Sequence, residues 1–299
     1  MNRGRQGDFC FPDARFCILS CIFALLAVTC SYILEIYMNL LLTNDDGIRS
    51  PGMAALVEEL CEDHELFVSA PDRQRSAAGC SMTIRAPLTA EPYAFPDHPE
   101  IRAYAVSGTP VDCVRLGFGA LFPQPDAVIS GINLGPNRGT DVLYSGTCGA
   151  AQEAAIHGHP ALALSLDGRH DRPFVHFETA ARLARLGLKL LQGQPLPFGG
   201  YYSINVPDLP LDRLKGVRYA PLGLVLYEAA YELQGDEDGK RVYYECGERI
   251  PNDDVPRDTD EYWLAHGYAT VTALGFDCAL SLSVPARKTI DDYLKGIPS

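Results

Sequence analysis

Two adjacent aspartates are the first residues whose positions suggest chemistry. Asp45 and Asp46 follow the run "NLLL" after Thr43 and Asn44, and they precede a glycine. Two carboxylates at the end of a buried strand repel each other and lose hydration, so their pKa values rise or they recruit a cation. A hard divalent ion with oxygen ligands relieves this conflict. The alternative is an Asp-Gly turn with solvated acids, and the pair alone does not decide between the two.

Neutral oxygen donors lie in two further loops that follow predicted strands. Ser76 lies in "APDRQRSAAG" near two arginines, and its hydroxyl could be a weak metal ligand while an arginine clamps phosphate oxygens. In "SGINLGPNRG" the amide oxygen of Asn133 could coordinate a metal, and Asn137 could hydrogen-bond an anion. The glycines there allow backbone N–H groups to close around a phosphate. A solvated surface loop and a plain structural turn are the alternatives.

A third candidate is the start of an alanine-rich helix in "YSGTCGAAQEAA". Ser145, Gly146 and Thr147 lie just before this helix. Unpaired N–H groups at a helix start, together with hydroxyl groups, form an anion site. An N-cap is the structural explanation, and it is compatible with anion binding.

The elements that must position these residues alternate between strands and helices. Such alternation predicts an α/β fold, in which a parallel sheet carries helices on both faces. Ligands of open α/β sheets bind outside the carboxyl ends of the strands. The predicted strands occupy 39–42, 65–71, 101–107, 125–133, 160–166 and 201–207. The predicted helices occupy 51–63, 147–158 and 177–193. A further helix is predicted to begin at Pro110, after an N-cap at Thr109.

The C-terminal third has a different character. Residues 224–247, "LVLYEAAYELQGDEDGKRVYYECG", alternate around "GDEDG", which predicts a long hairpin. The hairpin is rich in tyrosine and leucine. It therefore either contacts another copy of the chain or folds back on its own domain.

Composition limits the class of partner. The chain has 299 residues and a formal net charge of −13, which argues against a nucleic acid polymer because such binders need clustered Lys and Arg. Small phosphorylated ligands need only one local positive centre and are not excluded. Of ten cysteines, four fall in the first 37 residues, and the others are scattered without a C-x-x-C pair. This favours buried free thiols in a reducing compartment.

The N-terminal segment 1–37 is a hydrophobic leader. The run "FCILSCIFALLAVTCSYIL" between Arg15 and Glu35 is uncharged and about long enough to cross a bilayer. One interpretation is a signal-anchor with its arginines on the cytoplasmic side. The other, which we favour, is that translation starts at Met38, immediately before the first strand, and that the preceding residues are an upstream artefact. We therefore expect a cytoplasmic protein without a membrane partner, anchored only if the leader is translated.

Six blocks of this sequence resemble the SurE family, the survival-protein 5′-nucleotidases. They are "NDDGIRSPG", "APDRQRSAAG", "SGTPVDCV", "SGINLGPNRG", "YSGTCGAAQEA" and "INVPD", in this order, and the resemblance covers Met38 to the C-terminus. It implies a Rossmann-like core of about residues 38–200 and a hairpin and oligomerisation region of about 201–299, with a swapped C-terminal part and a homodimer or homotetramer. It also implies a metal-dependent phosphatase acting on nucleoside 5′-monophosphates, with 3′-nucleotides and short polyphosphate as substrates of some members.

The resemblance also implies roles for individual residues. One divalent ion per subunit, Mg²⁺ or Mn²⁺, would be held by Asp45, Asp46, Ser76 and Asn133. The phosphate and the rest of the substrate would be bound by Asn44, Asn137, Ser145, Gly146 and Thr147. The departures are Gln152, where methionine is expected, Ala77, where glycine is usual, and the leader.

We expect water to attack the phosphate with the help of Asp45 or Asp46, and a direct aspartyl nucleophile is the alternative. The helix start and the Asn137 loop would orient the phosphate. A non-catalytic metal- and nucleotide-binding module is the second functional hypothesis. A signalling receiver domain fits less well, because Ser107 and Asn133 occupy the loops where it needs an aspartate and a lysine.

Overall fold

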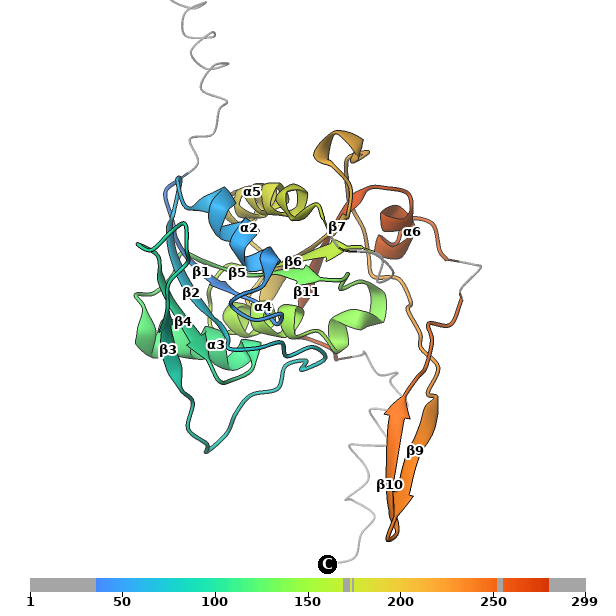
Figure 1. Cartoon of the computed structure of the whole chain (residues 1–299). Coiled ribbons are helices and arrows are strands. Elements are labelled where there is room, and N and C mark those ends of the chain that lie inside the picture. The colour runs from blue at the N-terminus through green and yellow to red at the C-terminus, as the bar shows by residue number, and fades with distance from the viewer. Residues whose placement is uncertain (1–35, 169–172, 174, 252–254, 280–299) are drawn as a thin grey trace, which may run out of the picture. The chain divides into compact units, whose positions relative to one another are not determined.

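The computed structural model describes residues 36–168, 173, 175–251 and 255–279 (Figure 1). The predicted leader lies outside these ranges, apart from residues 36 and 37. The leader and the domain boundaries therefore stay predictions. Everything below concerns the unit Tyr37–Ser299.

A nine-stranded, mostly parallel sheet forms the centre of this unit (Figure 1). The strand order is β3-β4-β2-β1-β5-β6-β7-β11-β8. Only two neighbouring pairs, β3 with β4 and β11 with β7, run antiparallel. The α/β, Rossmann-like prediction is confirmed. The strands are β1 Asn39–Thr43, β2 Glu65–Pro71, β3 Ala90–Tyr93, β4 Arg102–Val106, β5 Ala127–Leu134, β6 Ala161–Asp167, β7 Gly200–Pro207, β8 Val217–Tyr219 and β11 Ala269–Gly275.

Helices cover both faces of the sheet, α2 (Pro51–Leu60) and α5 (Phe177–Gly193) on one and α3 (Pro110–Leu116) and α4 (Gly146–Ile156) on the other (Figure 1). Side chains of β1 alternate between two apolar clusters, with Leu40 and Leu42 in one and Leu41 in the other. A strand buried on both faces must be apolar throughout, which explains the run "NLLL". No helix in the described ranges is both long and apolar enough to cross a membrane.

Side-chain caps fix the starts of three helices. Ser50 and Ser145 accept hydrogen bonds from Met53 N at 3.2 Å and Cys148 N at 3.0 Å. Thr109 and Asp112 form the reciprocal capping box of α3, so the predicted start of that helix is confirmed. Two ends differ from prediction, since α2 stops at Leu60 and α4 at Ile156, before the residues expected from periodicity.

The predicted hairpin is present as a separate two-stranded sheet, β9 (Tyr231–Glu237) and β10 (Lys240–Glu245). Its strands are shorter than the predicted 224–247, because residues 224–230 form only an isolated bridge between Tyr227 and Arg249. The sequence did not predict β3, β8, β11 or the short helix α6 (Asp260–Ala265). Short turns of helix complete the fold, namely η1 Gly117–Leu121, η2 Gly139–Leu143 and η3 Leu211–Arg213.

The contact between α2 and β5 can be tested at Gly52. A Cβ there would lie 2.1 Å from the carbonyl oxygen of Ile132. We predict that Gly52→Ala lowers the free energy of unfolding by about 2 kcal/mol, because the helix must move off the sheet. Helix propensity alone predicts the opposite sign.

Gly193→Ala is the matched control, since it also lies in a helix and a Cβ there meets nothing within 4 Å. We expect the control to be neutral or stabilising by up to about 1 kcal/mol. Urea denaturation of both variants measures the difference. Equal stability of the two would contradict the close packing of α2.

Candidate functional site

A pocket of about 410 Å³ lies beyond the carboxyl ends of β1, β5 and β6. Parallel strands end at the same edge of a sheet, and their loops meet there. Five of the residues predicted from sequence line this pocket: Asp45, Ser76, Asn133, Asn137 and Ser145. Residues from three separate loops and one helix start are thus brought together.

Asp45 is held against the start of α4. Its side chain is buried, and Thr147 Oγ1 donates a hydrogen bond to Oδ1 at 2.7 Å. Gly146 lies so close that a Cβ there would be 2.9 Å from Asp45 Cβ. Burial raises the pKa of Asp45, while hydrogen bonds from the Thr147 hydroxyl and from the backbone at this helix start oppose the rise. Gly146 and Thr147 therefore hold Asp45 in place from behind the pocket.

Asp46 contacts Leu134, the last residue of β5, and is not among the residues that line the pocket. Its Oδ2 accepts from Leu134 N at 2.7 Å, and its Oδ1 accepts from Gln74 Nε2 at 3.3 Å. Burial, and after it the negative charge of Asp45, raise the pKa of Asp46 to about 6. The two hydrogen bonds oppose this rise. The repulsion between the Asp45 and Asp46 carboxylates that the sequence predicted is therefore present.

The Ser76 loop is tied to the aspartates through its backbone. Arg75 N donates to Asp45 O at 2.7 Å, which places Ser76 at the pocket. The Arg75 guanidinium instead donates to Ser107 O at 2.6 Å. Asn133 Nδ2 donates to Gly135 O at 2.8 Å, which fixes the plane of the side-chain amide. Its Oδ1 therefore points away from the Gly135 carbonyl.

Two neighbouring strands position Asn137. Its Nδ2 donates to Ser165 Oγ on β6 at 2.8 Å. Its backbone N–H donates to Asn205 Oδ1 at 2.7 Å, and its carbonyl accepts from Asn205 Nδ2 at 2.9 Å. The loop is thereby fixed next to Ser145, which caps α4 and whose hydroxyl keeps its own proton to donate. Asn205 lies in "INVPD", one of the six blocks that resemble the family, and this was the sequence signal for it.

Asn44 does not line the pocket. Its amide donates to Gly47 O at 3.0 Å and to Ser50 Oγ at 2.7 Å, and it accepts from Gly47 N at 3.1 Å. These bonds shape the turn that carries the aspartates and connect it to the cap of α2. The side chain of Asn44 thus positions the loop, whereas its predicted role in substrate binding stays a prediction.

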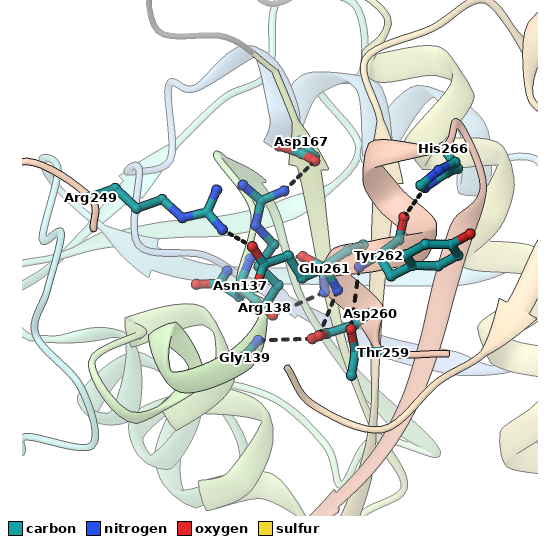
Figure 2. Close-up of polar contacts among 11 residues, drawn as sticks. Asn137, Arg138, Gly139, Asp167, Arg249, Thr259, Asp260, Glu261, Tyr262 and His266 are labelled. Carbon is teal, nitrogen blue, oxygen red and sulfur yellow. Dashed lines mark hydrogen bonds and ion pairs between the residues drawn. The ribbon is translucent and has the colours of Figure 1, made fainter. Parts of the chain in front are cut away.

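Sequence reasoning did not find the opposite wall of the pocket. This wall, which we define as Arg138, Asp141, Asp167, Tyr227 and Arg249, comes from four parts of the chain. Arg138 donates to Asp167 Oδ2 at 2.8 Å, and Arg249 is hydrogen-bonded to Glu261 of α6 (Figure 2). Arg138 lies within the block "SGINLGPNRG" and Asp141 follows that block by two residues, so both had a usable sequence signal. Tyr227 and Arg249 follow no motif.

Asp260 connects the two sides of the pocket. It is fully buried, and its Oδ2 accepts from Gly139 N at 2.8 Å (Figure 2). Its Oδ1 accepts from Gly223 N and from Glu261 N, both at 2.7 Å. Burial raises the pKa of Asp260, and these backbone N–H groups oppose the rise. One carboxylate thus ties the loop that carries Asn137 to the segment that leads to Tyr227.

The donor set at the aspartate pair fits one hard divalent ion. All of its atoms are oxygens, and two carboxylates with raised pKa values lie side by side. Within the described ranges no cluster of three or more His, Cys, Asp or Glu side chains could hold a metal. Any ion here would have Asp45 and Asp46 as its charged ligands, and these two carboxylates would balance the charge of a divalent ion. Occupancy by Mg²⁺ or Mn²⁺ stays a prediction.

Comparison with known proteins gives consistent results. Residues 40–229 match the family model for survival protein SurE. The 5′-nucleotidase SurE of Thermosynechococcus vestitus is 42% identical over 247 residues, covering 80% of this chain and 91% of that protein. The 5′/3′-nucleotidase SurE of Erwinia tasmaniensis is 44% identical, with the same coverage. The SurE crystal structure from Aquifex aeolicus superposes with a TM-score of 0.67 at 34% identity, covering 86% of this chain and 99% of the other.

The raised pKa of Asp46 predicts how stability depends on pH. The folded state binds this proton more tightly than the unfolded state, in which the pKa is near 3.8. The free energy of unfolding of the metal-free protein should therefore fall as pH rises from about 4 to about 6. Asp46→Asn removes this loss, so the metal-free variant should be more stable than wild type by roughly 1–2 kcal/mol near neutral pH, a value reduced for partial exposure.

Urea denaturation in the presence of a chelator, near neutrality and at about pH 4, tests this prediction. The gap between variant and wild type should vanish at the lower pH. Asp97→Asn, at an exposed surface carboxylate, is the matched control and should change stability at neither pH. A variant that is no more stable than wild type near neutrality would refute the raised pKa.

Proposed function

The chain belongs to the survival protein SurE family, and on this basis we propose that it is a metal-dependent 5′-nucleotidase that hydrolyses nucleoside 5′-monophosphates to nucleoside and phosphate. The observation that carries the proposal is the aspartate pair, of which Asp45 is buried and lines a pocket that Asn137 and Ser145 also line. The name of the Erwinia tasmaniensis relative supports 3′-nucleotides as further substrates. Short polyphosphate remains a family-based expectation.

Four residues would hold one Mg²⁺ or Mn²⁺ ion: Asp45, Asp46, Ser76 and Asn133. When bound, such an ion attracts the phosphate and stabilises negative charge on the transferring phosphoryl group. This explains how a chain with a net charge of −13 could take an anionic substrate. The chain's own contribution is to keep the donor atoms oriented through Thr147, Leu134 and the Ser76 loop.

The phosphate would be oriented by neutral donors on the opposite side of the aspartates. The Ser145 hydroxyl would donate its proton, and the positive end of the α4 dipole lies at the same helix start. The Asn137 loop supplies further donors and is fixed by Ser165 and Asn205. Donors that are already fixed lower the cost of reaching the transition state, because they need not reorganise.

The aspartates would also handle the proton of the attacking water. A general base works best when its pKa lies near the working pH. Burial and the Asp45 charge bring the pKa of Asp46 to about 6, close to that condition. We therefore assign Asp46 as the acceptor of this proton, and Asp45, held by Thr147, as the fixed partner.

We also propose a homo-oligomer and a cytoplasmic location. The hairpin β9–β10 exposes apolar side chains of Tyr231, Leu233, Val242, Tyr243 and Tyr244, which supports a contact with a second copy. Every cysteine in the described part of the chain is a free thiol, and Cys113 and Cys148 are buried. Free thiols support a reducing compartment.

Phosphate release from AMP tests the proposed function. With Mg²⁺ or Mn²⁺ present, we predict turnover that a chelator abolishes. Asp45→Asn should lower kcat/KM by about 10³-fold, because a charged ligand and the position of the partner carboxylate are lost together.

Asp97→Asn is again the control and should retain wild-type turnover, since this carboxylate is exposed away from the pocket. Full activity of Asp45→Asn, or turnover that a chelator does not change, would contradict the metal-dependent mechanism. Binding of AMP without any phosphate release would instead identify a non-catalytic binding module.

A further inference from the structure

The pocket has two chemically different sides. One side carries Asp45, Ser76 and Asn133, and the pocket is also lined by Asn137 and Ser145. The opposite wall is formed by the segment after β5, the end of β6 and the C-terminal segment. A nucleotide whose phosphate lies at Asn137 and Ser145 must place its remaining atoms against that wall.

The charges of the opposite wall compensate one another. Arg138 is paired with Asp167, and both side chains are largely buried, at 16% and 17% exposure. Arg249 is paired with Glu261, which lies behind it in α6. The wall therefore offers two cations that are already neutralised, together with the further acid Asp141. A second phosphate group needs uncompensated positive charge, and the described residues of this wall do not supply it.

Aromatic surface lines the same part of the pocket. Tyr227 and Tyr144 both line it and are 54% and 66% exposed. Tyr227 is hydrogen-bonded to Asp141, which holds the ring in place, and the pKa of Tyr227 is raised by burial and by this acid. A tyrosine ring that is fixed and still accessible is a suitable stacking surface for a nucleobase.

The wall is fixed before any ligand arrives. Residues Tyr227 and Arg249 pair as an isolated antiparallel bridge, and Thr140 is hydrogen-bonded to Val225 O. Asp260 accepts from Gly139 N (Figure 2) and also from Gly223 N, so it joins both sides. Binding to a preorganised surface costs less side-chain entropy than binding to a mobile one.

We propose that the opposite wall binds the nucleoside and selects substrates in which a single phosphate is attached to a neutral sugar and base, against chains of linked phosphates. The assignment rests on the proposed phosphatase activity and adds to it the residues that choose the substrate. Tyr227 stacks on the base, and the paired arginines present polar but neutralised surface to the sugar.

Three substrates test the base contact and the charge separately: AMP, ribose 5-phosphate and inorganic tripolyphosphate. For the wild-type protein we expect kcat/KM to be about tenfold higher for AMP than for ribose 5-phosphate, the size of one stacking contact. Tripolyphosphate should be the poorest substrate. Tyr227→Leu should lower the ratio of AMP to ribose 5-phosphate toward one. Tyr219→Leu, at an exposed tyrosine outside the pocket, should keep the wild-type ratio.

Glu261→Gln tests the charge argument, because it leaves Arg249 without its counter-ion and changes almost no volume. The ratio of kcat/KM for tripolyphosphate to that for AMP should rise by about tenfold. If thermal melting shows that this variant does not fold, Asp141→Asn removes a charge from the wall itself and should shift the ratio in the same direction.

Unchanged ratios in folded variants would overturn the assignment, as would a wild-type protein that hydrolyses tripolyphosphate as fast as AMP. Absence of phosphate release from both monoesters has a different meaning. It would refute the proposed phosphatase activity, and the nucleoside assignment with it.

Discussion

The repulsion between two neighbouring carboxylates governs the design of this site. Asp45 and Asp46 lie at the end of a strand that is buried on both faces, so neither can reach full hydration. Every loop around them contributes a partial compensation. The start of α4 donates to Asp45, and the last residue of β5 donates to Asp46. These neutral donors lower the cost of the two charges without removing it, which leaves a role for a cation.

The sheet and the C-terminal segment contribute different residues to the pocket. Parallel strands bring the acidic pair, Asn133 and Asn137 to one edge of the sheet, and helix caps fix the loops between them. The C-terminal segment then adds Tyr227 and Arg249 across the pocket, held by α6. In the proposed function the aspartate pair would carry the chemistry, and the wall to which this segment contributes would contact the rest of the substrate.

Most of the sheet and one side of the site could be predicted from sequence because their signals are local. Apolar runs marked β1, β2, β5 and β6, and capping residues marked the starts of α3 and α4. Asn44 shows the limit of a family resemblance, which implied substrate binding, since the structure shows its amide engaged in the turn.

The opposite wall had a local signal only at Arg138 and Asp141, which lie in or next to the block "SGINLGPNRG". Gly139 and Asp260 are 121 residues apart, and only the folded chain brings them together. The edge strands β3 and β8 are short and partly exposed, so they lack the apolar periodicity that marks a buried strand.

Calorimetric titration of the metal-free protein with Mn²⁺, at about pH 6 in two buffers of different ionisation enthalpy, tests the central claim most directly. An ion that binds between two carboxylates of raised pKa must displace their protons. We predict one ion per chain, with proton release at this pH that largely disappears by about pH 8. Binding without proton release at either pH, or equal binding by the Asp45→Asn variant, would contradict the account.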